Sequence, residues 1–403
     1  MPGAPRVLLA NEAGGGRGHV TTLRAMALGL GPGLPMVAAL GRMTYAGVLA
    51  DICERVLPAP RLTRLPGSSA DPQMSGNVTW GDTLAALGMG DEGVVRRGLK
   101  WWRKTIVDED ISILIADFAP LALRAAQGLA EEGWAIRTIT IGTGYSAPPA
   151  SIACFPAYFN DFGEVLNSET ETLARLNRVG EEVGLSPLPS LPALYRADLA
   201  LAATFGFLDP YAGMRPPGGR IAPLTAVPKA FAGAGDEVFV YFSTRELEDV
   251  ALVDALASLK LPRRGYLPSA TSDVRARLAA SGMALTDAPV SPDEIARRSR
   301  LIVHAAPHGS ICMAALAGVP QIGVPQHLEQ LFHARRAEAA GILRIVPRGG
   351  EGIADAIAVA YGDTALQDHA REFTASLRLE HPGDPLAILA ERLVPELEAS
   401  LRA

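Results

Sequence analysis

Residues 301–342, LIVHAAPHGSICMAALAGVPQIGVPQHLEQLFHARRAEAAGI, decide the expected fold of the second half of the chain. A short apolar strand at 301–303 runs into a turn of small residues and then into a helix expected to begin near Ile311. A strand, a tight turn and a helix N-terminus present free backbone N–H groups and the positive end of the helix dipole to one point. Ser310 stands where an N-cap hydroxyl is expected, so it can donate to an anion there. The segment therefore predicts a phosphate site.

The same stretch continues into a second predicted strand at 320–325, which is followed by Glu329 and Gln330 at the start of another helix. A carboxylate and a neighbouring amide offer hydrogen-bond acceptors and donors for sugar hydroxyls. A phosphate site followed by such a pair is what a protein needs to hold a sugar attached to a diphosphate.

A second informative segment is the glycine-rich turn NEAGGGRGH at residues 11–19, which follows an apolar strand and precedes a helical pattern. Its four glycines let the backbone turn tightly and approach a ligand closely. A Walker loop would require Gly-Lys followed by Ser or Thr, and a dinucleotide fingerprint would place glycine where this chain has His19. Neither a P-loop nor NAD binding is therefore expected from this turn.

These segments resemble the motifs of nucleotide-sugar-dependent family 1 glycosyltransferases, and most of all their bacterial macrolide-type branch. The family's donor pattern, roughly H-G-G-x-G-[ST], E-A-L-x-x-G-V-P and P-x-x-x-[DE]-Q-x-x-N-A-x-R, is matched in order by His304, Gly309-Ser310, Gly318-Val319-Pro320, Pro325, Glu329-Gln330, Ala334 and Gly341. One residue is inserted before Gly309, so either His304 or His308 can take the place of the family histidine. The other departures from the pattern are Ala305, Ala306, Met313 and His333.

The resemblance implies an α/β fold of GT-B architecture: two facing Rossmann-like domains with parallel sheets, and a C-terminal helix that crosses back to the first domain. It implies inverting transfer of a hexose or deoxyhexose from a UDP- or dTDP-linked donor to an acceptor hydroxyl. His19 would be the general base and Asp117 its orienting partner. Neither a metal nor a cofactor is implied. The donor contacts would be Ser243, Thr244, Val290, His304, His308, Gly309, Ser310, Glu329 and Gln330, and the acceptor contacts Gly16, Gly18, Gly144 and Tyr145.

The residues themselves support these roles, with alternatives. Histidine has an ordinary pKa near 6.5, which suits a general base, and a base histidine usually needs an acceptor on its other nitrogen. Asp117 ends an apolar strand, at the edge where open α/β sheets place ligand groups. The alternative role for His19 is a helix cap or a phosphate contact, and the alternative for Asp117 is the N-cap of the helix at Pro120. For Ser243 and Thr244, a helix-capping role with the following glutamate is an equal alternative.

The domain organisation follows from length and from glycine and proline content. A chain of 403 residues suits two domains, and short apolar runs alternate with helical patterns as in parallel α/β proteins. Glycine and proline concentrate over residues 206–235. We therefore expect a domain boundary near residue 226. The resemblance then implies an acceptor-binding domain at 1–226, a nucleotide-sugar-binding domain at 227–383 and the C-terminal helix at 384–403.

Composition limits the class of protein. A net charge of −6 argues against nucleic acid as a partner. No apolar run reaches the ~18 residues of a membrane span, and no signal peptide is evident. The three cysteines have no paired spacing, which fits a reducing cytoplasm. We expect a cytoplasmic protein, with peripheral attachment to the inner membrane as an alternative, because basic residues flank Trp101 and Trp102. A homodimer is one option for its assembly.

Three alternative functions remain at this stage. They are a transferase acting on a lipid acceptor at the inner membrane face, a nucleotide-sugar epimerase, and a degenerate nucleotide-sugar binding protein without catalysis. A metal site at His304 and His308 is disfavoured because the pair straddles Pro307 and no H-E-x-x-H is present. The aromatic residues over 145–159 favour a small apolar or aromatic acceptor.

Overall fold

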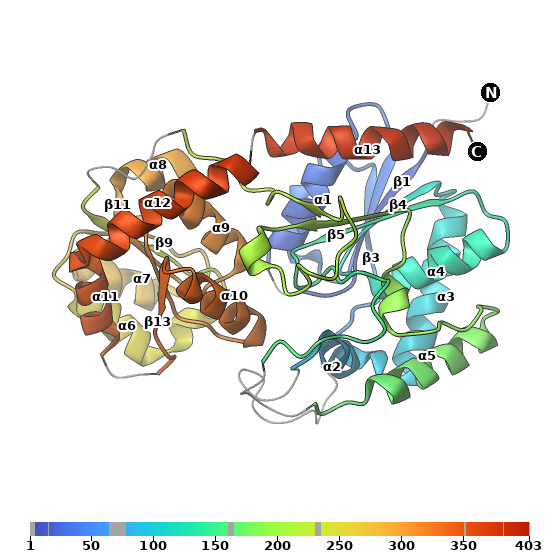
Figure 1. The fold of residues 1–403 in the computed structure, drawn as a ribbon, viewed down its shortest axis with the longest axis horizontal. Helices are drawn as coiled ribbons and strands as arrows, with labels where there is room; N and C mark the ends of the chain where they lie inside the picture. Colours follow the sequence, from blue (N-terminus) through green and yellow to red (C-terminus); the bar gives the residue numbers. More distant parts are fainter. Residues whose placement is uncertain are drawn as a thin grey trace. The chain divides into compact units, whose positions relative to one another are not determined.

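A computed structural model describes residues 5–14, 16–63, 78–159, 165–229, 235–349, 352–381 and 383–402. The chain divides into two compact units, each with its own parallel sheet (Figure 1). The first unit is made of Met1–Thr204, Asp209–Leu224 and Pro385–Ala403. The second unit is made of Phe205–Leu208 and Thr225–Asp384.

The sheet of the first unit has seven strands among the described residues, in the order β3-β2-β1-β4-β5-β6-β7. All its pairings are parallel, and its central strands are buried along their whole length, as expected when helices cover both faces. The strands are β1 (Val7–Asn11), β2 (Met36–Leu40), β3 (Arg55–Pro58), β4 (Ile113–Asp117), β5 (Arg137–Gly142), β6 (Leu199–Ala203) and β7 (Arg220–Ile221).

The helices of the first unit include one from the far end of the chain. They are α1 (Gly18–Gly29), α2 (Trp80–Leu84), α3 (Glu92–Asp108), α4 (Pro120–Glu131), α5 (Glu169–Glu182) and α13 (Pro385–Arg402), with short turns of other helix types at Met43–Val48, Ala85–Met89 and Pro192–Tyr195. Helix α13 lies along α1 (Figure 1). A Cβ at Gly29 would lie 3.0 Å from the Cβ of Leu389, so glycine lets the two helices approach. Leu389 and Leu393 complete the core above β1 and β4.

The second unit repeats the architecture with six parallel strands in the order β10-β9-β8-β11-β12-β13. These strands are β8 (Glu237–Tyr241), β9 (Arg263–Tyr266), β10 (Ala284–Thr286), β11 (Ser299–His304), β12 (Gln321–Gly323) and β13 (Leu343–Ile345). The helices are α6 (Val250–Ser258), α7 (Ser272–Ala280), α8 (Pro292–Arg298), α9 (His308–Ala317), α10 (Leu328–Ala339), α11 (Ile353–Gly362) and α12 (Thr364–Glu380), with 3-10 turns at Gly206–Leu208 and Glu246–Glu248.

The strand order reverses once in each sheet. The chain leaves β1 toward β2 and β3 on one side and later returns to β4 on the other side, and it does the same at β8 and β11. Ligands of open α/β sheets bind at the carboxyl ends of the strands at such reversals. The predicted α/β class, with two parallel sheets and a C-terminal helix packed on the first unit, is confirmed.

Candidate functional site

The strand reversal of the first unit brings His19 and Asp117 together. His19 is the second residue of α1, which follows β1, and Asp117 is the last residue of β4, the neighbour of β1. Nδ1 of His19 lies 3.0 Å from Oδ1 of Asp117. The Asp117 side chain is only 2% exposed, whereas the imidazole is 24% exposed. Because Nδ1–H faces a carboxylate, the other nitrogen, Nε2, is the one that can accept a proton from a ligand.

The alternative roles in helix capping do not fit the geometry of either residue. The N-cap position of α1 is Arg17, so His19 lies inside the helix, which begins three residues earlier than the sequence pattern suggests. The N-cap of α4 is Ala119, whose side chain makes no capping bond. The backbone N–H groups of Leu121 and Ala122 instead donate to the carboxylate of Glu12, a residue that sequence reasoning missed.

Gly14 packs directly against the imidazole of His19. Its φ is +98°, and a Cβ on it would lie 2.2 Å from both Cδ2 and Nε2 of the ring. Only glycine fits this position without displacing the histidine. The predicted acceptor residues Gly16 and Gly18 lie in the same turn, where a Cβ would meet nothing closer than 3.9 Å at Gly16 and nothing within 4 Å at Gly18. The turn is therefore tight against His19 at Gly14 and open at Gly16 and Gly18.

The other predicted acceptor residues, Gly144 and Tyr145, follow β5 in the same unit. Aromatic rings connect this segment to the histidine, since Phe118 lies 5.9 Å from His19 and 4.9 Å from Trp80, and Trp80 lies 5.6 Å from Tyr145. Tyr145 is buried and also packs against Tyr158, at 4.4 Å between ring centroids. The structure thus joins Tyr145 to the His19 neighbourhood through a row of aromatic side chains.

A buried ion pair fixes the Gly144 segment. Arg215 pairs with Asp209 at 2.6 Å, and neither side chain is more than 7% exposed. The same guanidinium donates to the backbone carbonyls of Gly144 at 2.9 Å and Ala147 at 2.7 Å. Its two partners on the loop lie more than sixty residues away in sequence, so no local pattern pointed to Arg215.

In the second unit, β11 leads into the turn with the two candidate histidines. His304 is fully buried, the N–H of Ala306 donates to its Nδ1 at 2.8 Å, and its Nε2 lies 2.9 Å from Oε1 of Gln321. Nδ1 is therefore the acceptor and Nε2–H the donor, so both ring nitrogens are used inside the protein. Burial lowers the pKa of His304 to about 4, which keeps the ring neutral. His308 is the histidine that stands at the start of α9.

The N-terminus of α9 differs from the expected one. The helix begins at His308 rather than near Ile311, because Pro307 takes the N-cap position with φ −68° and ψ 146°. Ser310 is therefore in the first turn and not at the N-cap, and its N–H donates to the carbonyl of Pro307. Gly309 is exposed in that first turn. Ala306, where the resembled pattern has glycine, keeps a glycine-like φ of +59°.

The remaining donor candidates lie on other turns of the same unit. Gln330 is buried and its Oε1 accepts from the N–H of Gln326 at 2.7 Å, while Glu329 is partly exposed in the first turn of α10. Thr244 donates both its N–H and its hydroxyl to the carboxylate of Glu246, at 2.7 and 2.8 Å. Ser243 is partly exposed beside it, at the end of β8. The expected link from Thr244 to Glu246 thus exists, in a 3-10 turn rather than at the start of an α-helix.

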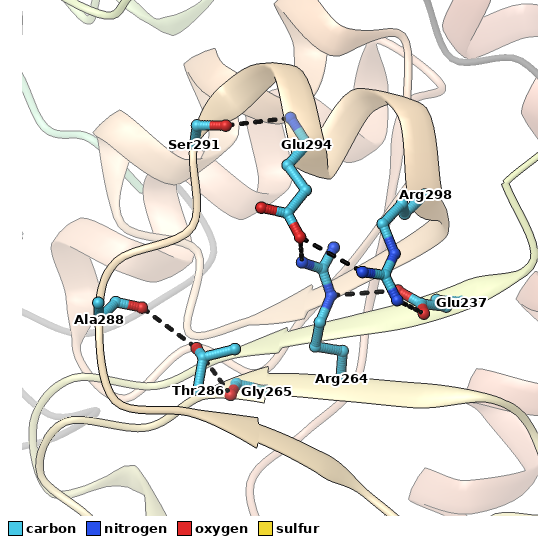
Figure 2. Close-up of polar contacts among 8 residues, drawn as sticks. All are labelled: Glu237, Arg264, Gly265, Thr286, Ala288, Ser291, Glu294 and Arg298. Atoms are coloured by element: carbon cyan, nitrogen blue, oxygen red, sulfur yellow. Dashed lines mark hydrogen bonds and ion pairs between the residues drawn. The ribbon is translucent and has the colours of Figure 1, made fainter.

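Val290 lies on a short segment between β10 and α8 that several polar contacts hold in place (Figure 2). The hydroxyl of Thr286 donates to the carbonyl of Ala288 at 3.2 Å, and Ser291 caps α8 by accepting from the N–H of Glu294. Val290 itself packs at the edge of an apolar cluster beneath α8 and α9.

Arg264 anchors the helix that follows this segment. Its side chain is 3% exposed and forms ion pairs with Glu237, at 3.1 Å, and with Glu294, and Arg298 pairs with the same two carboxylates (Figure 2). The guanidinium also lies over the ring of Phe239. Arg264 therefore ties α8 to the sheet and fixes the end of the Val290 segment.

Two kinds of feature are absent from the described part of the chain. Within these ranges, no three or more His, Cys, Asp or Glu side chains are grouped so as to hold a metal ion. No helix among the same residues has the length and apolar character needed to cross a membrane.

No protein-family model matches the sequence, and no curated protein matches it. Solved structures do match along nearly their whole length. The calicheamicin glycosyltransferase CalG4 has a TM-score of 0.67 at 15% identity, with 100% of this chain and 99% of that chain covered. The glycosyltransferase VinC, solved in complex with DTDP, has a TM-score of 0.66 at 14% identity, with 98% and 100% covered. A UDP-glucosyltransferase from Polygonum tinctorium capable of glucosylating indoxyl has a TM-score of 0.62 at 16% identity, with 98% and 99% covered. The chain therefore has the GT-B fold of these glycosyltransferases.

Proposed function

We propose that this protein is a glycosyltransferase that moves a hexose or deoxyhexose from a UDP- or dTDP-linked donor to an acceptor hydroxyl with inversion. The observation that carries the proposal is the His19–Asp117 pair, 3.0 Å apart at the strand reversal of the first unit. The likeness in fold to glycosyltransferases supports it, and one of these was solved with DTDP.

In the proposed reaction, the acceptor hydroxyl donates its proton to Nε2 of His19 as its oxygen attacks the anomeric carbon. A new C–O bond forms, the bond from the sugar to the diphosphate breaks, and the diphosphate leaves with the electron pair. The proton stays on the imidazole, whose positive charge the carboxylate of Asp117 stabilises through Nδ1–H. The partly exposed imidazole and its buried carboxylate partner support this role.

The leaving diphosphate would be held at the N-terminus of α9. His308, Gly309 and Ser310 form its first turn, and the positive end of the helix dipole favours an anion there. His304 is the weaker candidate, because it lies at the end of β11 and outside this first turn. Donor binding in this form uses backbone and side-chain donors, with neither a metal nor a cofactor.

The other donor contacts follow from the same edge of the sheet. The base would lie at the segment of Val290, Glu329 and Gln330 would contact the sugar hydroxyls, and Ser243 would assist the phosphates. Thr244 is less suited because its hydroxyl is already bound to Glu246. For the acceptor, the row of rings from His19 to Tyr145 supports a small apolar or aromatic molecule.

The test is sugar transfer by wild type and by His19→Ala, with UDP- and dTDP-hexoses and a panel of hydroxylated aromatic acceptors. Wild type is expected to release nucleoside diphosphate only when an acceptor is present. The substitution is expected to lower turnover by ~10²–10⁴ and to leave donor affinity unchanged. His369→Ala, at an exposed histidine on α12, serves as the control. Equal turnover in wild type and His19→Ala would remove the base from the mechanism.

A further inference from the structure

The His19–Asp117 pair is built from two separate loops, and one of them is rich in glycine. His19 follows the turn that contains Gly14, Gly16 and Gly18, a composition that leaves the backbone many conformations to lose on folding. Asp117 opens the turn between β4 and α4. The distance between the two side chains therefore depends on what fastens one loop to the other.

Four hydrogen bonds that involve Asn11 or Glu12 connect the two loops. The side-chain amide of Asn11 donates to the carbonyl of Asp117 at 2.9 Å, and the N–H of Glu12 donates to the carbonyl of Phe118 at 3.2 Å. The N–H groups of Leu121 and Ala122 donate to the two carboxylate oxygens of Glu12, each at 3.0 Å. Glu12 alone makes three of these bonds, and it is 1% exposed.

The turn that Glu12 holds is strained. Phe118 has φ +50°, a left-handed conformation that is unfavourable for a residue with a side chain and persists only where the surroundings enforce it. Its carbonyl is the group that accepts from the N–H of Glu12, and the carboxylate of Glu12 binds the residues three and four positions further on. Glu12 thus binds the carbonyl of the strained residue and the first turn of the helix that follows it.

The N-terminus of α4 is capped by a side chain from another loop, which does more than stabilise the helix. Helix N-termini are ordinarily capped by the N-cap side chain itself, a short polar residue. In α4 that position holds Ala119, which makes no cap, and the carboxylate comes from a residue more than one hundred positions earlier. Such a cap fixes the helix end relative to β1 and to the loop that carries His19.

We infer that Glu12 is a positioning residue for the base, acting through Asp117. Its carboxylate and N–H hold the Asp117–Ala119 turn against the loop of His19, so that the Nδ1–H of His19 meets Oδ1 of Asp117. The expected effect of Glu12 on turnover rests on the proposed function, whereas its expected effect on the His19–Asp117 contact does not.

The test replaces Glu12 by glutamine, which keeps its size but turns one accepting oxygen into an NH₂ group facing a backbone N–H. In protein labelled with ¹⁵N-histidine, the Nδ1–H of His19 bound to Asp117 is identified by its loss in His19→Ala. Glu12→Gln is expected to shift or broaden this signal. Asp198→Asn is the control, because Asp198 also accepts a backbone N–H bond, at 2.7 Å from Thr138, but at the amino end of β5. An unchanged signal in Glu12→Gln overturns the inference, whatever the activity.

Turnover of the same variants tests the effect on the reaction. Glu12→Gln is expected to lower kcat about tenfold or more without changing the dissociation constant of the donor, whereas Asp198→Asn keeps wild-type kcat. In a double-mutant cycle with Asp117→Asn, Glu12→Gln is expected to add almost no further loss, because both act on one contact. Full multiplication of the two losses overturns the inference. If wild type transfers no sugar but Glu12→Gln shifts the Nδ1–H signal of His19, the proposed function is contradicted and the positioning role stands.

Discussion

Replacing Gly14 by alanine tests whether His19 must stay where the structure has it. The new Cβ would lie 2.2 Å from Cδ2 and Nε2 of the imidazole, whereas unstrained carbon contacts need about 3.5 Å. The ring or the loop must therefore move by about 1 Å or more. A displacement of that size costs a catalytic group roughly 10²-fold, which corresponds to ~2.7 kcal/mol of activation free energy.

The substitution also acts on the backbone, and this part needs its own control. Gly14 has φ +98°, so alanine there costs ~1–3 kcal/mol of folding stability regardless of the ring. Gly133 has nearly the same φ, +93°, with nothing within 4 Å of a new Cβ. It lies in the exposed turn after α4. Gly133→Ala therefore reproduces the backbone strain without touching His19.

The assay is release of nucleoside diphosphate at saturating donor and acceptor, with urea unfolding measured on the same samples. Both alanine variants are expected to lose similar stability, but only Gly14→Ala loses ~10²-fold in kcat. If kcat of Gly14→Ala falls within about threefold of Gly133→Ala, a displacement of His19 has no consequence for the reaction and the reasoning is refuted.

Three further predictions concern the second unit. Burial lowers the pKa of His304 from its ordinary value near 6.5 to about 4, so ~3 kcal/mol of stability is present above pH 6.5 and is lost as the pH falls toward 4. His304→Gln should flatten the pH dependence of urea unfolding over that range, and an equal slope would contradict the assignment. Ala306→Gly relieves the strain of a φ of +59°, so its loss in the free energy of unfolding should be ~1 kcal/mol smaller than that of Ala305→Gly at the equally buried neighbour. Equal losses in the two variants would rule out strain at Ala306. Arg264→Met should lower the free energy of unfolding in urea by ~2–3 kcal/mol and weaken donor binding. Arg371→Met, which breaks an exposed ion pair, should lower it by less than ~1 kcal/mol. Similar losses in the two variants would show that Arg264 does not anchor α8.

The proximity of His19 and Asp117 was predictable from sequence. Asp117 ends one apolar strand, His19 follows the turn after another, and neighbouring parallel strands end at one edge. Their roles in catalysis stay predictions. The two parallel sheets were predictable because apolar runs alternate with helical patterns along the chain, and the C-terminal helix on the first unit was predictable from the resemblance in motifs.

The choice between His304 and His308 was not predictable from the motif, because the inserted residue allows both alignments. Both histidines are buried, so burial does not separate them. Only His308 lies in the first turn of α9, and its contact with a diphosphate stays a prediction. The start of α9 was misplaced for a local reason, since Pro307 takes the N-cap position that the pattern gave to Ser310.

Glu12 and Arg215 were missed because their partners are far away in sequence. Glu12 binds residues more than one hundred positions later, and Arg215 binds a loop more than sixty positions earlier. Neither lies in a spacing typical of a known site. Their importance appears only when the sheet has placed the loops beside each other, which no local pattern encodes.

The most direct test of the proposed donor site is calorimetric titration of UDP and dTDP into wild type and Gly309→Asp. Gly309 is exposed in the first turn of α9, and a new Cβ there would meet nothing within 4 Å. The aspartate should therefore preserve or slightly stabilise the helix while repelling a diphosphate. We expect wild type to bind at least one of the two nucleotides and Gly309→Asp to bind it about tenfold more weakly or worse, with an unchanged unfolding midpoint. Failure of wild type to bind either nucleotide, or equal binding by the variant, would contradict a donor diphosphate at this helix.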